Sequence, residues 1–120
     1  MTASVDPETL ELAVDIDLLD QALINLVRNA IDALRDTQDG VIALSARRDP
    51  DGRIAIAVAD NGPGIPPGER EKVFVPFYTT KRQGSGIGLT IVRQIATAHG
   101  ARVDISTAPG GGGALVTLRF

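Results

Sequence analysis

Two asparagines lie four residues apart in a segment that is otherwise mostly apolar. The spacing of Asn25 and Asn29 puts both side-chain amides on one face of a helix, one turn apart. Amide oxygens are hard ligands that suit Mg²⁺, which usually keeps water and phosphate oxygens as its other ligands. The pair is therefore a candidate metal site. The alternative is two asparagines that satisfy each other's hydrogen bonds.

A carboxylate followed by glycines comes directly after the most apolar predicted strand. Asp60 begins this segment, and Gly62, Gly64 and Ile65 follow it. A carboxylate at a strand end can accept a hydrogen bond from the amino group of a flat heterocycle, and residues without a Cβ atom let the backbone approach that ring. The segment is a candidate site for such a ring, with a plain turn as the alternative.

A glycine-rich run, GSGIGL at residues 84–89, opens a predicted helix. Free backbone N–H groups and the helix dipole make such a start a phosphate site, here at Gly86, Gly88 and Leu89. The pattern is GxGxG and no predicted strand precedes it, so the strand-turn-helix of a dinucleotide fold is excluded. The sequence of a P-loop, GxxxxGKS or GxxxxGKT, does not occur in the chain.

Three of the chain's four aromatic residues gather in the aperiodic segment 74–81. Phe74 and Phe77 belong to this cluster, which is typical of a loop that folds back and anchors itself. Lys81 ends the segment close to the glycine-rich run, where its charge can meet a phosphate. The alternative is a structured loop with a solvated lysine.

The elements that must position these residues follow from hydrophobic periodicity. Apolar residues recur at helical spacing in two long segments, and short alternating runs predict strands. Asp17 is the expected N-cap of the first helix. In chain order we predict a strand at 10–14, a helix at 18–34, a hairpin of strands 41–47 and 53–59, a short helix at 69–73, a loop at 74–85, a helix at 86–99, and strands 103–107 and 114–120. This order predicts an α/β fold, a two-layer sandwich with a mixed, mostly antiparallel sheet and helices on one face.

The composition narrows the possible functions. A length of 120 residues fits one domain. The chain has no cysteine, which excludes disulfides and thiolate metal sites. Its net charge of −3 gives no electrostatic reason to expect nucleic-acid or anionic-membrane binding. No apolar run approaches the ~20 residues that cross a bilayer, and the first residues lack the pattern of a signal peptide. We therefore expect a cytoplasmic domain.

The order and spacing of the four motifs resemble those of sensor histidine kinases. Residues 25–30 resemble the N box, 60–65 the first glycine box, 74–81 the F box and 84–89 the second glycine box, while 111–117 resemble the glycine-rich tail. The short segment between Lys81 and Gly84 is similar to that of nitrogen-regulator-type kinases. The resemblance implies the Bergerat-type ATP-binding fold, shared with gyrase, mismatch-repair ATPases and a large ATP-driven chaperone.

The resemblance also implies roles for the site residues. Asn29 would ligand Mg²⁺ with Asn25 beside it, and Asp60 would accept the adenine amino group of ATP. Phe74 and Phe77 would anchor the base of a lid over the nucleotide. Backbone close to adenine would come from Gly62 and Gly64, with Ile65 against the ring, and the phosphates would face Lys81, Gly86, Gly88 and Leu89. Relatives often carry a Thr after the last glycine, where this chain has Ala114. No side chain of this chain is assigned a catalytic role.

For the function, the resemblance implies transfer of the γ-phosphoryl group of Mg-ATP to a histidine on a separate dimerisation domain, with a response regulator as indirect partner. Residues 1–120 would be the catalytic ATP-binding domain without that dimerisation domain, inactive and monomeric in isolation, whereas the parent protein would be a homodimer that can be membrane-anchored. His99, the chain's single histidine, stands at a helix end and is expected to be structural.

Two other functions remain as alternatives. ATP-hydrolysing relatives of the gyrase and chaperone type place a Glu four residues before the Mg²⁺ asparagine. This chain has Asn25 there, and an amide cannot act as a general base at neutral pH. The second alternative is a module that binds nucleotide without catalysis, and the intact Asn29, Asp60 and glycine boxes argue against it.

Overall fold

A five-stranded sheet and two long helices make up most of the part of the chain that the structure describes. The computed structural model describes residues 1–6, 12–75 and 88–120. In chain order the elements are β1 (Thr2–Asp6), α1 (Ile16–Ala33), β2 (Ile42–Arg48), β3 (Ile54–Asp60), the 3₁₀ turns η1 (Pro67–Glu69) and η2 (Lys72–Phe74), α2 (Gly88–Ala98), β4 (Arg102–Thr107) and β5 (Ala114–Arg119). Neither α1 nor α2 is long and apolar enough to cross a membrane.

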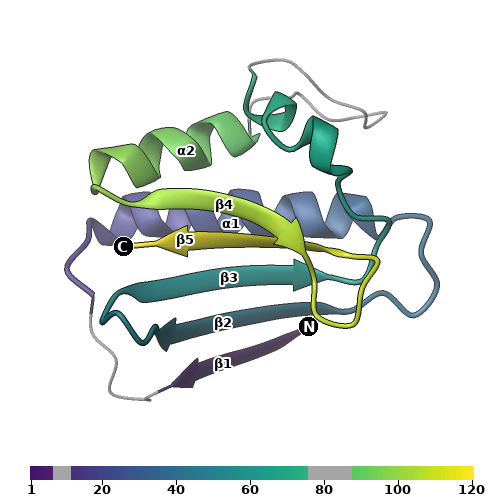
Figure 1. Ribbon diagram of the computed structural model, residues 1–120, viewed down its shortest axis with the longest axis horizontal. Coiled ribbons are helices and arrows are strands. Elements are labelled where there is room, and N and C mark those ends of the chain that lie inside the picture. Colours follow the sequence, from purple (N-terminus) through teal and green to yellow (C-terminus); the bar gives the residue numbers. More distant parts are fainter. Residues whose placement is uncertain (7–11, 76–87) are drawn as a thin grey trace.

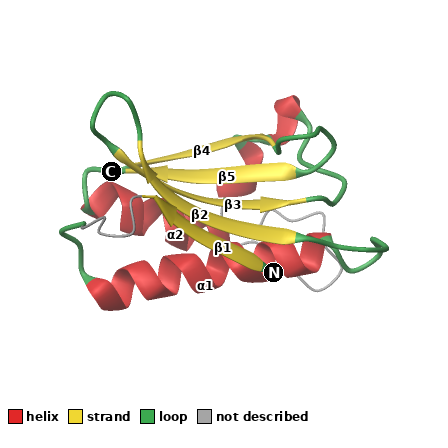
Figure 2. Cartoon of the chain, turned by 90° about the horizontal axis from the view of Figure 1, so that it is seen from below, coloured by secondary structure: helices red, strands yellow, loops and turns green. Residues whose placement is uncertain are grey.

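The strands form one mixed sheet in the order β1-β2-β3-β5-β4. Among the described strands β1 and β2 pair in parallel, and the other neighbouring pairs are antiparallel. Both helices lie on the same face of this sheet, so the domain has two layers (Figures 1 and 2). The predicted fold class, a two-layer α/β sandwich with a mostly antiparallel sheet, is confirmed.

The core lies between the helices and the sheet. Its largest fully buried side chains are Leu26 from α1, Val92 from α2 and Leu118 from β5. Small residues, including Ala22, Ala30 and the α2 residue Ala96, fill the space between these three in the same cluster. Because small residues let backbones approach, α1 and α2 pack closely enough to bring the two asparagines of α1 beside the first residue of α2.

Helix α1 begins at Ile16, two residues before the start that the spacing of apolar residues predicted. Asp15 is the N-cap, because its backbone is extended and its carboxylate accepts hydrogen bonds from the N–H groups of Asp17 (3.0 Å) and Leu18 (3.2 Å). The prediction of Asp17 as N-cap is therefore wrong. The first helical residue, Ile16, is 70% exposed and gave no sign of a buried helical face.

The first strand also differs from the prediction. Residues 12–14 are not in a strand, and residues 10 and 11 lie outside the described part of the chain. The edge strand is instead Thr2–Asp6, which pairs with β2 from Thr2 opposite Ala43 to Asp6 opposite Arg47. All five residues of β1 are exposed, so its position depends on hydrogen bonds to β2 rather than on a buried apolar face.

The remaining elements agree with the sequence more closely. Strands β2 and β3 form the predicted hairpin, with Gly52 at a φ of +86° in its turn. The short helix predicted at 69–73 is replaced by two 3₁₀ turns, the first of which starts behind Pro66. Helix α2 ends at the predicted cap, where Gly100 has a φ of +67°. The start predicted for this helix, Gly86, lies outside the described residues.

Candidate functional site

Asp60 has a buried carboxylate, and one of its two oxygens accepts hydrogen bonds from backbone amides. It is the last residue of β3 and is 9% exposed. Its Oδ1 accepts hydrogen bonds from the N–H groups of Gly62 (2.9 Å) and Ala114 (3.3 Å). Its Oδ2 makes no hydrogen bond to any residue that the structure describes. A buried, oriented carboxylate thus keeps one acceptor oxygen for a ligand.

Glycines surround Asp60 because its neighbours approach backbone to backbone. A Cβ atom on Gly113 would lie 1.7 Å from the Asp60 carbonyl oxygen, and one on Gly64 would lie 2.7 Å from the Gly112 carbonyl oxygen. A Cβ atom on Gly62 would lie 2.9 Å from the carbonyl oxygen of Ala33, at the end of α1. These positions admit only glycine without a shift of the chain, so the first glycine box and the glycine-rich tail form one packed unit.

Ala114 takes part in this unit through its backbone. Its side chain is 6% exposed, and its N–H group donates to Asp60 Oδ1 at 3.3 Å. The hydroxyl that relatives often carry at this position is missing here. The position still contributes to the site, because the orientation of Asp60 depends on the amide and not on the side chain.

The two asparagines of α1 face the first residue of α2. A Cβ atom on Gly88 would lie 3.6 Å from Asn25 Oδ1 and 3.8 Å from both Nδ2 and Oδ1 of Asn29. Asn25 Nδ2 donates to the carbonyl oxygen of Gln21 at 3.0 Å. Since the nitrogen of that amide is engaged along its own helix, its oxygen is directed towards Gly88. The arrangement offers amide oxygens beside the start of a helix, as a site for Mg²⁺ and phosphate would.

The contact with the Gly62 position and the two asparagines lie along one helix, α1. Ala33, which contacts the Gly62 position, is one turn beyond Asn29 and two turns beyond Asn25. At the helical rise these intervals are about 6 and about 12 Å. In Figure 1 α1 and β3 end on the same side of the domain, and α2 starts above the middle of α1. The sequence-predicted residues of three motifs are thus brought together.

Phe74 is fixed to the first turns of α2. The ring is buried, the Thr90 hydroxyl donates to the Phe74 carbonyl oxygen at 2.9 Å, and the Arg93 guanidinium carbon lies 4.7 Å from the ring centroid. Arg93 also pairs with Glu71 at 3.3 Å. Sequence reasoning had no signal for Thr90 or Arg93, since both stand in an ordinary helical segment.

The other predicted positions divide into two groups. Leu89 is half-buried and packs against the core, and Ile65 is half-buried in the loop that follows β3. Phe77, Lys81 and Gly86 lie outside the described residues, so their predicted roles stay predictions.

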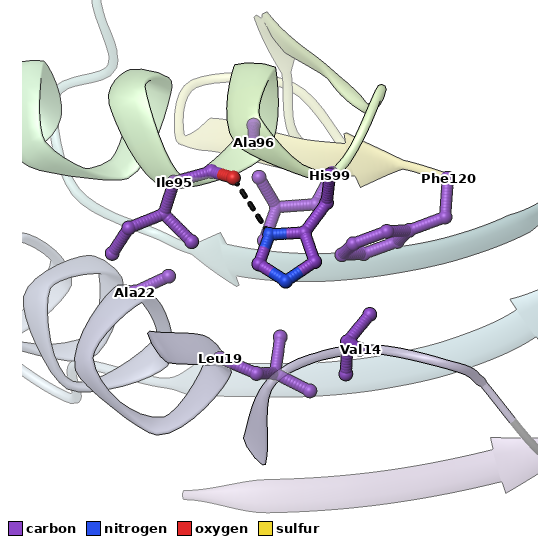
Figure 3. A pocket seen from close by; sticks show the side chains of 8 residues that line it. Val14, Leu19, Ala22, Ile95, Ala96, His99 and Phe120 are labelled. Carbon is purple, nitrogen blue, oxygen red and sulfur yellow. Dashed lines mark hydrogen bonds between the residues drawn. The ribbon is translucent and has the colours of Figure 1, made fainter. Parts of the chain in front are cut away.

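His99 is half-buried just past the other end of α2. Its Nδ1 donates to the Ile95 carbonyl oxygen at 2.8 Å, its Nε2 accepts from the Asp15 N–H group at 3.1 Å, and its ring meets Phe120 edge to face. The ring lines a cavity of about 10 Å³ together with apolar side chains such as Val14 (Figure 3). This cavity is too small to admit a ligand. Both ring nitrogens are used in the fold, which agrees with a structural role.

Residues 14–120 match the model of one protein family, described as histidine kinase-, DNA gyrase B- and HSP90-like ATPase. The chain belongs to this family. The match covers α1, both glycine-rich segments and the tail, and so includes every residue predicted to contact nucleotide. The family resemblance inferred from the four motifs is confirmed.

Curated relatives of the chain are sensor proteins by name. The chain is 37% identical over 112 residues to sensor histidine kinase ZraS of Klebsiella oxytoca, covering 93% of this chain and 24% of ZraS. It is 39% identical over 113 residues to the C4-dicarboxylate transport sensor protein DctB of Rhizobium meliloti, covering 94% of this chain and 18% of DctB. The chain therefore spans about a quarter of these relatives or less.

Solved histidine kinase structures share the fold. The nucleotide-free catalytic domain of ThkA superimposes with a TM-score of 0.85 at 31% identity, covering 99% of this chain and 77% of that one. Full-length ShkA, in complex with AMPPNP, gives a TM-score of 0.82 at 32% identity, covering 98% of this chain and 24% of that one. In each case nearly the whole of this chain is matched.

The packing of Gly113 generates a first prediction. Gly113→Ala places a methyl group on the Asp60 carbonyl oxygen, so the tail or the first glycine box must move. We expect unfolding free energy to fall by about 1–3 kcal/mol, the usual cost of overpacking. Urea denaturation followed by circular dichroism measures this change. Gly68→Ala is the control, because nothing lies within 4 Å of its added Cβ atom. Equal stabilities for the two variants would contradict the packing.

Proposed function

We propose that residues 1–120 are the catalytic ATP-binding domain of a sensor histidine kinase, without its dimerisation domain. The domain binds Mg-ATP and donates the γ-phosphoryl group to a histidine on that separate domain. The observation that carries the proposal is Asp60, a buried carboxylate with Oδ1 bound by the N–H groups of Gly62 and Ala114. Its second oxygen is suited to accept a hydrogen bond from the amino group of adenine.

The names of the relatives support the reaction. ZraS is a sensor histidine kinase, and NtrB of Rhizobium meliloti, 38% identical over 112 residues, is a sensory histidine kinase/phosphatase. ShkA was solved with AMPPNP, and ThkA was solved in complex with the response regulator TrrA. By analogy, this chain takes ATP, serves a homodimeric parent protein and acts indirectly on a response regulator. We place the domain in the cytoplasm, as a monomer when alone, with no nucleic-acid partner.

The chain's own residues act mainly by positioning. Asp60 and Ile65 hold the adenine ring at one end of α1, and Gly62 and Gly64 let the backbone close on it. The first turn of α2, at Gly88, offers N–H groups to the phosphates beside the two asparagines. Transfer of a phosphoryl group depends largely on such positioning and on neutralising charge, so this domain needs no side chain that takes part in covalent chemistry.

Mg²⁺ fits the side chains that face Gly88. Asn29 would hold the ion through its Oδ1, and Asn25 would stand beside it, with its own oxygen directed to the same place by the bond to Gln21. Amide oxygens are hard donors that suit this ion. When bound, Mg²⁺ would neutralise charge on the phosphates.

Hydrolysis of ATP by the lone domain is the less favoured function. Hydrolysing relatives carry a glutamate where this chain has Asn25, and the amide nitrogen of Asn25 is hydrogen-bonded to its own helix. Neither atom of that amide can take a proton from water at neutral pH. The site therefore supports phosphoryl transfer to a supplied acceptor rather than to water.

Adenine recognition predicts a dependence on Asp60. Asp60→Asn replaces one carboxylate oxygen by an amide nitrogen and should raise the Kd of ATP about 5–150-fold, because losing a buried hydrogen-bond partner costs about 1–3 kcal/mol. GTP presents a carbonyl where ATP presents an amine, so it should bind poorly to the unmodified chain. Calorimetric titration measures both, with the exposed Asp36→Asn as control. Similar affinities for ATP and GTP would contradict the assignment of Asp60 to the adenine amino group.

The metal assignment predicts a difference between nucleotide with and without Mg²⁺. Asn29→Ala should weaken binding of Mg-ATP much more than binding of metal-free ATP, since only the first uses the amide oxygen. Titrations in Mg²⁺ and in EDTA test this, with Gln94→Ala on the exposed face of α2 as a control amide. An equal loss under both conditions would mean that Asn29 serves packing and not the ion.

The acceptor requirement predicts little turnover by the chain alone. His99 cannot receive the phosphoryl group, because it lies eleven residues from Gly88, just past the other end of α2. That is about 16 Å at the helical rise, while transfer needs atoms about 3–3.5 Å apart. With γ-labelled ATP we expect no label on the isolated chain and label on an added histidine-bearing dimerisation domain. Rapid phosphate release without acceptor, or acid-labile label on His99, would favour an autonomous ATPase or a self-modifying enzyme.

A further inference from the structure

The loop between Asp60 and Ile65 is held at its first turn by a side chain that no motif assigns to the nucleotide. Asn61 Oδ1 accepts a hydrogen bond from the Val41 N–H group at 2.7 Å, and its Nδ2 donates to the Asp39 carbonyl oxygen at 3.0 Å. One amide thus uses both of its ends on the connection between α1 and β2, about twenty residues away in sequence. The loop is thereby tied to the segment that follows α1.

The connection that Asn61 holds is itself strained. Asp39 has a φ of +55° and is the one residue other than glycine with a positive φ in the described ranges. An L-residue in this region costs free energy and persists where its surroundings impose it. A Cβ atom on Gly40 would lie 3.1 Å from the Leu34 side chain, so the turn is also tight. The two Asn61 bonds lie on either side of Gly40 and fix this conformation.

A second side chain holds the far end of the loop. Arg70 Nε donates to the Ile65 carbonyl oxygen at 3.1 Å, and its Nη2 donates to the Thr107 hydroxyl at 3.1 Å. Thr107 is the last residue of β4. The guanidinium therefore ties the last residue of the loop to β4, an edge strand of the sheet.

We infer that Asn61 and Arg70 are positioning residues that set how strongly the site discriminates adenine from other bases. This inference rests on the proposed function. Asp60 and Ile65, the residues assigned to the adenine amino group and ring, are the two ends of the held loop. A carboxylate that is fixed in place accepts a hydrogen bond from an amine and repels a carbonyl oxygen at the same position. If either tie is lost, Asp60 or Ile65 can shift, and the penalty against the carbonyl of guanine falls.

The test compares ATP and GTP on the same variants of the 120-residue chain. Both nucleotides displace a fluorescent ATP analogue, and thermal melting monitors folding. The variants are Asn61→Ala, Asn61→Asp, Arg70→Met and Arg70→Lys, with Arg53→Met as a control in the exposed β2–β3 turn. Asn61→Asp keeps the acceptor for Val41 but sets oxygen against the Asp39 carbonyl, and Arg70→Lys can reach one acceptor instead of two.

We expect the Kd of ATP to rise about three- to tenfold in Asn61→Ala and Arg70→Met, the range for one or two lost hydrogen bonds. The Kd of GTP should change less, so the GTP-to-ATP ratio of Kd values falls about threefold or more. Asn61→Asp should behave like Asn61→Ala, Arg70→Lys should lie between Arg70→Met and the unmodified chain, and Arg53→Met should keep the original ratio.

An unchanged ratio would overturn the inference, whether ATP affinity is kept or both nucleotides weaken equally, because a merely structural role lowers both together. If Asn61→Ala does not fold, Arg70→Met decides the question, since Arg70 is only half-buried. Failure of the unmodified chain to bind ATP is a separate result. It would refute the proposed function, and the inference with it, before any variant is compared.

Discussion

The contact between the Asp60 carbonyl and the backbone of Gly113 is the constraint on which the site depends. The two residues meet because β3 and β5 are neighbours in the sheet, and they meet this closely because Gly113 has no side chain. The same approach brings the Ala114 amide to Asp60 Oδ1. A sheet-forming pairing of strands thus also orients the carboxylate. The packing of the fold and the orientation of the carboxylate share one contact here, so neither can be altered alone.

Helix α1 links this unit to the rest of the site. Its last turn touches the Gly62 position, and its middle turns carry the two asparagines that face Gly88. Because a helix is stiff along its axis, the separation between the carboxylate and the amides is set by the count of residues between them. The core residues Leu26 and Val92 keep α1 and α2 together. The distance from Asp60 to the two asparagines is therefore fixed by helix α1 and by the core packing that holds α1 and α2 together.

Much of this arrangement follows from the sequence. The two long helices, the β2–β3 hairpin, and the places of Asn25, Asn29 and Asp60 in α1 and at the end of β3 were predictable, since periodicity and motif spacing are local properties. Strand β1 was not, because all its residues are exposed and its pairing with β2 is a long-range event. Asp15 was missed in favour of Asp17 because both are aspartates beside an exposed isoleucine. The roles of Asn61 and Arg70 appear only when residues about 20 and 37 positions away are brought beside them.

The use of a backbone amide at position 114 bears on how such domains vary among relatives. Every amino acid except proline has a backbone N–H group that can make this contact. The contact therefore does not require any particular side chain at position 114. The burial of Ala114 limits size but not chemistry. A hydroxyl-bearing or a methyl side chain at position 114 would therefore leave this N–H contact to the carboxylate in place. Comparisons that score residue identity alone would overlook such a position.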